Sequence, residues 1–367
     1  HEVGHTLGLR HNMGASSATP VENLRDKAWV EKHGHTSSIM DYARFNYVAQ
    51  PEDHIGEAGI FPRVNDYDEW AIRWGYTYYP DAKSELEERA TLNRLTVATI
   101  TDNPRLWFGG EGRDNNPYAL TEDLSDDVMK ASDYGLLNLR RVVKALPEWT
   151  YEAGNLGDNL TRGYDAAVGQ FRRYVGHVCR QIGGVKRVVK SVEQAGDVFS
   201  YDTRERQQRA LSWLDRRVLT EPTWITAPAY GARIGMPQLR VRPVAASAVD
   251  YLTSATMFDR LATNAAQQPA AQAYSPATYA DDLARVLFRE ALTGAKLSAW
   301  RMYVQNRAVN NLLEAYKSDT HGDGHAYVAA LLAKLRTRFD AARSTDAGTR
   351  AHYTDLARRI RLALEGK

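Results

Sequence analysis

The first eleven residues constrain this chain more than any other part of it. They read HEVGHTLGLRH. On a helix, His1 and His5 lie one turn apart and point to the same side. Two imidazoles placed in this way can occupy two tetrahedral positions on Zn²⁺. Glu2 lies beside them, where its carboxylate can accept a proton from an attacking water.

A third histidine, His11, follows six residues after His5. A continuous helix would carry it about 240° around the axis, away from a metal held by the first two. Gly8 lies between them, and glycine accepts the left-handed conformation that ends helices. We therefore predict a zinc helix over residues 1–8, a turn at Gly8 and His11 as the third ligand. Three protein ligands leave one position open, as in catalytic zinc sites.

A second motif, residues 37–42, reads SSIMDY. After the zinc motif it resembles the Met-turn of the metzincins, in which a methionine forms a hydrophobic floor beneath the three histidines. Met40 suits that role because its side chain is flexible and apolar. The resemblance implies that Tyr42 ligates zinc or stabilises an oxyanion, as the matching tyrosine does in astacins and serralysins. The alternative is a core methionine beside an ordinary turn.

Two positions depart from the best-known metzincin branches, namely Asn12 after the third histidine and Asp41 in the turn. The chain therefore does not resemble astacins, serralysins or matrixins most closely. It is most similar to the bacterial EcxA-like met-zincin group, which has a long C-terminal extension. That resemblance implies a secreted or periplasmic zinc metalloendopeptidase that acts on a peptide or protein substrate. Its further stretches are 67–76, 121–124, 182–184 and 207–224.

The chain has no initiator methionine and opens on a candidate metal ligand, so we interpret it as a C-terminal piece of a longer protein. Metzincins place a twisted sheet before the zinc helix, and its edge strand holds the substrate by strand addition. We expect this N-terminal sheet subdomain to be absent here. The expectation that follows is weak or no peptidase activity for this piece alone.

The hydrophobic periodicity favours a mainly α fold with a few short strands. We predict four parts: 1–125, the C-terminal part of a metzincin catalytic domain; 126–225, a helical extension; 226–275, an irregular Pro/Ala-rich connection; and 276–367, a C-terminal helical bundle. Gly75 and Pro147 are expected to end helices. The helices expected in the first two parts span 67–74, 81–95, 128–146, 156–178 and 204–219, with a hairpin over 185–198.

An acidic cluster precedes the helix expected at residue 128. It consists of Glu122, Asp123, Asp126 and Asp127. Carboxylate oxygens suit Ca²⁺, so calcium is a second candidate metal. The alternative, which we favour, is capping of the helix N-terminus and interaction with its dipole.

Composition excludes some partners. The net charge is +2 over 367 residues and no run of eighteen apolar residues occurs, so we expect neither a nucleic-acid partner nor a membrane span. The single cysteine, Cys179, follows an apolar stretch and is expected to be a core thiol. The sequence does not predict the oligomeric state.

Three functions fit these motifs. The first is a zinc metalloendopeptidase. The second is a non-catalytic helical binding module that retains a vestigial zinc site, and the third is a metal-dependent hydrolase of a non-peptide amide. Glu2 favours catalysis over the second, because a vestigial site has no need of a general base. The motif does not separate the first from the third.

Overall fold

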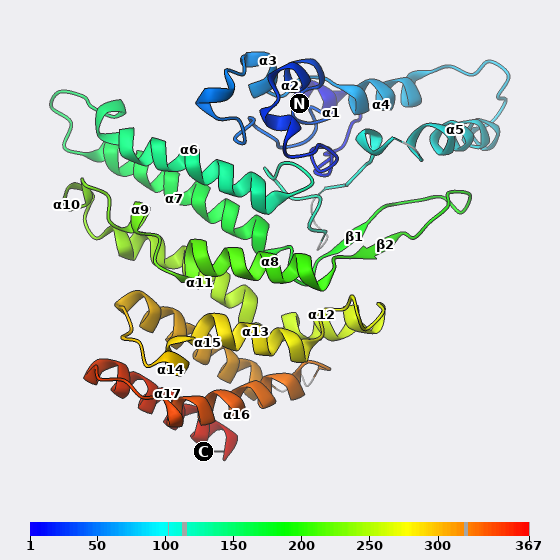
Figure 1. The fold of residues 1–367 in the computed structure, drawn as a ribbon. Coiled ribbons are helices and arrows are strands. Elements are labelled where there is room, and N and C mark those ends of the chain that lie inside the picture. The colour runs from blue at the N-terminus through cyan, green and yellow to red at the C-terminus, as the bar shows by residue number, and fades with distance from the viewer. Residues whose placement is uncertain (102, 112–115, 319–321, 367) are drawn as a thin grey trace. The chain divides into compact units, whose positions relative to one another are not determined.

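The computed structural model describes residues 1–101, 103–111, 116–318 and 322–366. These residues are mainly helical and include one two-stranded sheet, which confirms the predicted fold class (Figure 1). They form two compact units. Unit 1 comprises residues 1–139 and 184–201, and unit 2 comprises residues 140–183 and 202–367. The division into four parts stays a prediction.

Unit 1 consists of short helices, long connections and the hairpin. Asp26, Asn65 and Ser84 cap three of the helices by accepting hydrogen bonds from backbone N–H groups of the first turn. The elements are α1 (Glu2–Thr6), η1 (Asn23–Arg25), α2 (Lys27–His33), η2 (Pro51–Asp53), α3 (Glu57–Ile60), α4 (Asp66–Tyr76), α5 (Glu85–Ile100), η3 (Pro104–Leu106), β1 (Val185–Arg187), β2 (Phe199–Tyr201) and the first half of α6 (Val128–Trp149).

Polar contacts hold the segment after α1 in place. Residues 12–19 are mostly buried although many of them are polar. The Ser16 hydroxyl donates to the Asp123 carbonyl oxygen at 3.0 Å, and the Ser37 hydroxyl donates to the Ala15 carbonyl oxygen at 3.1 Å. Buried polar groups are stable only when they are paired, so these bonds fix the position of the segment.

The structure contains the predicted hairpin, but its second strand, β2, lies just beyond the expected range of 185–198. β1 pairs antiparallel with β2, and Val185 lies opposite Tyr201. The Lys186 ammonium lies 5.1 Å from the ring centroid of Trp107 and 4.9 Å from that of Tyr118. These two cation–π contacts attach the hairpin to the connection that precedes α6.

Unit 2 is a helical assembly. α11 contacts both α7 and α15, and α16 packs along α17. Its largest fully buried side chains include Trp213, Trp300 and Tyr164. The elements are the second half of α6, α7 (Asp158–Cys179), α8 (Arg204–Leu214), the π-helical turn η4 (Asp215–Leu219), α9 (Thr223–Thr226), α10 (Gly231–Ile234), α11 (Pro237–Thr253), α12 (Ala255–Ala266), α13 (Pro276–Phe288), α14 (Glu290–Thr293), α15 (Ala299–Lys317), α16 (His325–Ala341) and α17 (Ala347–Leu364).

The π-helical turn ends a helix, and its last carbonyl groups find partners on α15. The Trp300 indole N–H donates to the Val218 oxygen at 3.1 Å, and the Arg301 guanidinium donates to the Leu219 oxygen at 3.1 Å. Carbonyl groups at a helix C-terminus lack partners within the helix, so these contacts satisfy buried acceptors.

Three expectations about irregular structure are wrong. Gly75 lies inside α4 and Pro147 lies inside α6. Neither residue prevents the last turn of a helix from forming when the neighbouring carbonyl groups have hydrogen-bond donors. The stretch 226–275 is largely helical, through α11 and α12. Its alanines favour helix, and Pro237 occupies the first turn of α11, where a missing N–H costs nothing.

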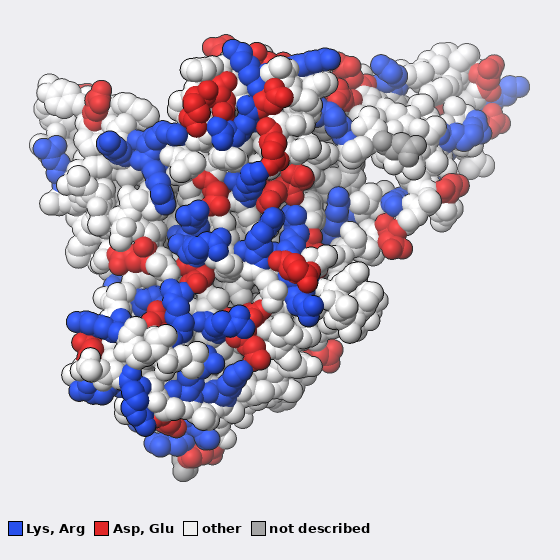
Figure 2. All heavy atoms as spheres, viewed as in Figure 1, with Lys and Arg blue, Asp and Glu red and all other residues white. Residues whose placement is uncertain are grey.

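No helix in the described ranges is long and apolar enough to cross a bilayer. Figure 2 shows basic and acidic side chains intermixed over the visible face. Charges of both signs at close spacing cancel one another's field beyond about 8–10 Å at physiological salt, so this face does not present an extended basic stripe.

Candidate metal centre

The candidate centre begins with α1, which ends at Thr6, two residues before the predicted bound, and the chain reverses at Gly8, where the sequence predicts a turn. Gly8 has φ +82°. The Leu9 N–H donates to the Gly4 oxygen and the Gly8 N–H donates to the His5 oxygen, each at 3.0 Å. This pair of bonds is a Schellman motif, in which a left-handed glycine closes the helix. The reversal directs the following segment back towards α1.

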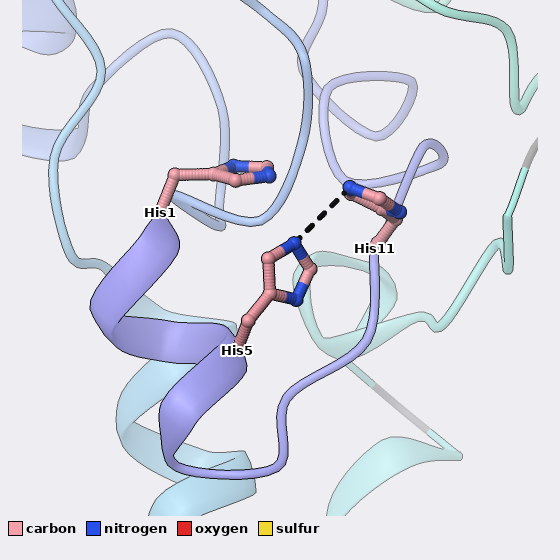
Figure 3. Close-up of side chains that lie close together, drawn as sticks. All are labelled: His1, His5 and His11. Carbon is pink, nitrogen blue, oxygen red and sulfur yellow. Dashed lines mark hydrogen bonds between the residues drawn. The ribbon is translucent and has the colours of Figure 1, made fainter.

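That reversal brings the three histidines together. One potential ligand atom from each of His1, His5 and His11 lies within 4.8 Å of the others. Figure 3 shows the His1 ring at the start of α1, the His5 ring on α1 and the His11 ring on the returning segment. The Nε2 atoms of His5 and His11 are 3.2 Å apart. In the described part of the chain, this is the one group of three such side chains close enough to share a metal ion.

Each of the three rings is oriented through its Nδ1 atom. The partner in every case is an oxygen that can only accept, so Nδ1 carries the proton and Nε2 keeps its lone pair in the neutral ring. The pairs are His1 with the Ile39 carbonyl at 2.7 Å, His5 with the Leu9 carbonyl at 2.9 Å, and His11 with the Glu111 carboxylate at 2.8 Å.

These contacts allow a test of whether the site suits zinc. The Nε2 atom of His1 is buried and has no hydrogen-bond partner among the described residues. The other two Nε2 atoms face each other with lone pairs, an arrangement that a cation between them stabilises. Zinc–nitrogen bonds of about 2.0–2.1 Å in a tetrahedron place nitrogens about 3.3 Å apart, close to the separation of His5 and His11. The donor set therefore fits a zinc ion.

Met40 lies against α1 and is fully buried. A Cβ added to Gly4 would overlap its sulfur atom and lie 3.3 Å from its methyl carbon. The Met40 carbonyl oxygen also accepts from the Asn12 N–H at 3.1 Å. Met40 thus packs on α1 with its side chain and accepts a hydrogen bond, through its backbone, from the segment that carries His11.

Asp68, on α4, holds the turn that contains Met40. Its carboxylate accepts from the Ser38 hydroxyl at 2.5 Å and from the Ile39 N–H at 2.7 Å. Burial raises the pKa of Asp68, and these bonds oppose the shift. Since the Ile39 carbonyl orients His1, the carboxylate of Asp68 supports a candidate ligand through one intervening residue.

Tyr42 and Glu2 occupy different environments. The Tyr42 ring stacks on His1 with centroids 5.0 Å apart and lies 4.8 Å from the His11 centroid. It is partly buried, whereas Glu2 is exposed in the first turn of α1. The aromatic ring thus packs beside two candidate ligands, and the carboxylate is accessible to solvent.

Sequence reasoning did not single out Asn12, Asp68 or Glu111 as site residues. The Asn12 side chain donates to the Trp107 oxygen at 2.9 Å and accepts from the Gly109 N–H at 2.8 Å. Asn12 differs from the residue at the same place in the best-known metzincin branches, and this difference is the one sequence signal that points to it. Glu111 lies 100 residues from His11, and no local pattern marks it.

The acidic cluster does not gather its ligand atoms in one place. Asp127 accepts from the Lys130 N–H at 3.2 Å, Asp126 accepts from the Val21 N–H at 3.0 Å, and Glu122 pairs with Arg44 at 2.9 Å. Asp123 is buried, which raises the pKa of its carboxyl well above the usual value, and the nearby Asp41 raises it further. The first of these contacts is the favoured capping interaction at α6.

His35 is not part of the three-histidine group. Its ring is fully buried, and Nε2 donates to the Ala43 oxygen at 2.8 Å. Burial lowers the pKa of His35 to about 4, so the ring is neutral at physiological pH. Its bond to Ala43 stabilises the segment that follows the turn at residues 37–42.

The Met-zincin family matches residues 1–294. Because the match covers most of the sequence, the chain belongs to the Met-zincin family, and the predicted metzincin resemblance is confirmed. Family membership implies a metallopeptidase-like fold and zinc binding. Comparison with curated proteins and with solved structures gave no significant match. The EcxA-like subgroup stays a prediction.

Proposed function

We propose that this protein is a zinc-dependent metalloendopeptidase in which His1, His5 and His11 hold the metal and Glu2 is the general base. The observation that carries the proposal is that one potential ligand atom from each of the three histidines lies within 4.8 Å of the others, while the Nδ1 atom of each ring already bonds to an oxygen. Such oriented rings are the form in which histidine binds zinc.

A zinc ion in this site supplies Lewis acidity and lowers the pKa of water towards about 7. Glu2 accepts the proton of the attacking water and passes it to the leaving amine. Its exposed position gives it access to both water and substrate. Tyr42 donates a hydrogen bond to the developing oxyanion. Met40 forms the apolar floor beneath the rings.

Metal analysis tests the site. We expect about one equivalent of zinc and its loss in His5→Ala. His33→Ala is the matched control, because His33 lies on α2 outside the three-histidine group. Zinc retained by His5→Ala, or lost equally in the control, would contradict the proposed ligands.

Peptide cleavage tests the reaction. We expect slow cleavage of an unfolded protein substrate that stops when a chelator is added. Glu2→Gln should reduce the rate by about 10²–10⁴-fold while zinc content stays unchanged. A Glu2→Gln variant as active as the unmodified protein would refute the role of the base.

The same assays separate the two alternative functions. A non-catalytic helical module with a vestigial site would show no chelator-sensitive turnover. A hydrolase of non-peptide amides would cleave small acylated amines in preference to peptides. We further propose that the enzyme is bacterial and either secreted or periplasmic, on the basis of the resemblance to EcxA-like proteins, and fractionation of the source cells tests this location.

A further inference from the structure

We propose that Glu111 is a positioning residue that fixes the orientation and basicity of His11 for the metal. This inference rests on the proposed function, because it concerns one of the three proposed zinc ligands. It adds to that function a residue distant in sequence whose removal weakens metal binding without removing a ligand.

The carboxylate of Glu111 bridges two residues of the returning segment. One oxygen, Oε2, lies 2.8 Å from His11 Nδ1, and the other, Oε1, lies 3.1 Å from Arg10 Nε. The side chain of Glu111 is 20% exposed, compared with 69% for Arg10. Charge-assisted bonds from two directions hold a carboxylate more firmly than a single surface ion pair does.

His11 differs from the other two candidate ligands in its support. The Nδ1 atoms of His1 and His5 bond to backbone carbonyl groups, whereas that of His11 bonds to a charged side chain. A carboxylate that accepts from Nδ1 fixes the tautomer and raises the basicity of Nε2. The support of His11 can therefore be removed by a single substitution.

The backbone that carries Glu111 is bound to the segment that carries His11. The Met13 N–H donates to the Gly110 oxygen at 3.0 Å. Gly109 and Gly14 cross so closely that a Cβ on Gly109 would lie 2.6 Å from the Gly14 nitrogen. This close approach sets the position of Glu111 through main-chain contacts, so its bond to His11 does not depend on a freely moving loop side chain.

Zinc affinity measured by competition with a chromophoric chelator tests the inference. We expect Glu111→Ala to weaken zinc binding by about 10–100-fold. Glu111→Gln keeps an acceptor without the charge and should show a smaller loss. Arg10→Ala removes only the outer partner of Glu111 and should weaken binding less than Glu111→Ala does.

The matched control is Glu52→Ala, which removes a carboxylate that pairs with Arg25 at 3.3 Å elsewhere in unit 1. It should bind zinc as tightly as the unmodified protein. Cobalt substitution supplies a second readout, because the visible absorption of bound Co²⁺ depends on ligand orientation and should change in Glu111→Ala but not in Glu52→Ala. Circular dichroism of the metal-free proteins should be the same for all of them.

Three outcomes would overturn the inference: Glu111→Ala binding zinc as tightly as the unmodified protein, Glu52→Ala losing as much affinity, or an unmodified protein that binds no zinc. The last outcome also refutes the proposed function. If the unmodified protein binds zinc and Glu111→Ala binds it weakly, but Glu2→Gln cleaves peptide as fast as the unmodified protein, the inference stands and the proposed function fails.

Discussion

Gly4 of α1 and Met40 of the turn at residues 37–42 pack so closely that no Cβ fits between them. A methyl group at residue 4 would overlap the Met40 sulfur atom. Met40 is fully buried, and its backbone also bonds Asn12. The contact therefore sets the distance between α1, which carries two candidate ligands, and the turn whose Ile39 carbonyl orients one of them.

We predict that Gly4→Ala destabilises the protein by about 1–3 kcal/mol, because overpacking at a buried contact forces the neighbouring groups apart. The same displacement should weaken zinc binding, since His1 and His5 flank the substituted residue. Urea unfolding and chelator competition measure the two effects.

Gly75→Ala is the control for this substitution. Gly75 lies within helix α4, and apart from its chain neighbours and the adjacent helix backbone no atom lies within 4 Å of the position that its Cβ would occupy. Alanine there should stabilise the helix by about 0.5–1 kcal/mol. Equal effects of the two glycine substitutions would contradict the role of the contact between residues 4 and 40.

A second prediction concerns Asp68. Asp68→Ala should cost about 2–4 kcal/mol, because it removes the acceptor of a buried donor on Ser38 and of partly buried N–H groups on Ile39 and Asn65. Asp68→Asn should recover part of this loss, since its amide oxygen still accepts from backbone N–H groups. Zinc affinity should fall with stability, because the turn at Ile39 orients His1.

Asp66→Ala provides the comparison on the same helix. Asp66 is 47% exposed and pairs with Arg105 at 2.5 Å. Exposed ion pairs contribute about 0–1 kcal/mol, so this variant should remain near the stability of the unmodified protein and bind zinc normally. A loss of zinc affinity in Asp66→Ala as large as in Asp68→Ala would show that α4 acts through its general stability.

The parts of the site that could be predicted from the sequence are those encoded within a few residues. Two histidines at helical spacing and a glycine after them specify local geometry, and Gly8 has the predicted left-handed conformation. The contacts of Glu111 and Asp68 join segments 100 and about 30 residues apart. No periodic pattern encodes such pairs, because they depend on how distant loops pack.

The prediction that α6 ends at Pro147 was wrong for a related reason. Pro147 was expected to end its helix because it cannot donate to the carbonyl four residues earlier. The structure supplies that carbonyl with a donor from Tyr230, 87 residues away in the chain. A rule about local bonding is overridden when tertiary structure provides the missing partner.

Asp41 and His35 shift stability with pH in opposite directions. Burial raises the pKa of Asp41 to about 7, so between about pH 4 and pH 7 the unfolded state releases a proton that the folded state keeps. Stability therefore declines as pH rises through this window. Burial lowers the pKa of His35 to about 4, so between about pH 4 and pH 6.5 the unfolded state binds a proton that the folded state does not. Stability from this group rises with pH.

We predict that Asp41→Asn removes the part of the stability that declines as pH rises. Relative to the unmodified protein, its free energy of unfolding should rise with pH by up to about 1.4 kcal/mol per pH unit between about pH 4 and pH 7. Asparagine can still accept from the Ser16 N–H and the Thr36 hydroxyl, which bond Asp41. Urea unfolding across this range, with chelator present to exclude metal binding, measures the slope. Parallel pH profiles for the two proteins would refute the prediction.

The last prediction concerns the carbonyl group of Val143 in α6. Because Pro147 has no N–H, this buried carbonyl accepts instead from the Tyr230 hydroxyl at 2.8 Å. Burial raises the pKa of Tyr230 to about 12, so the hydroxyl remains a donor across the physiological range. Tyr230→Phe leaves the carbonyl without a donor and should cost about 1–3 kcal/mol.

A double-mutant cycle isolates this interaction. In a Pro147→Ala background, the new N–H at residue 147 can bond Val143 within the helix, so Tyr230→Phe should cost less than about 0.5 kcal/mol. The ring centroids of Tyr230 and Tyr164 lie 6.5 Å apart in an edge-on arrangement. Phenylalanine at residue 230 retains this contact, so aromatic packing is the same in both backgrounds. Urea unfolding of the four proteins gives the coupling energy. An equal cost of Tyr230→Phe with and without Pro147 would mean that the hydroxyl does not replace the missing helical donor.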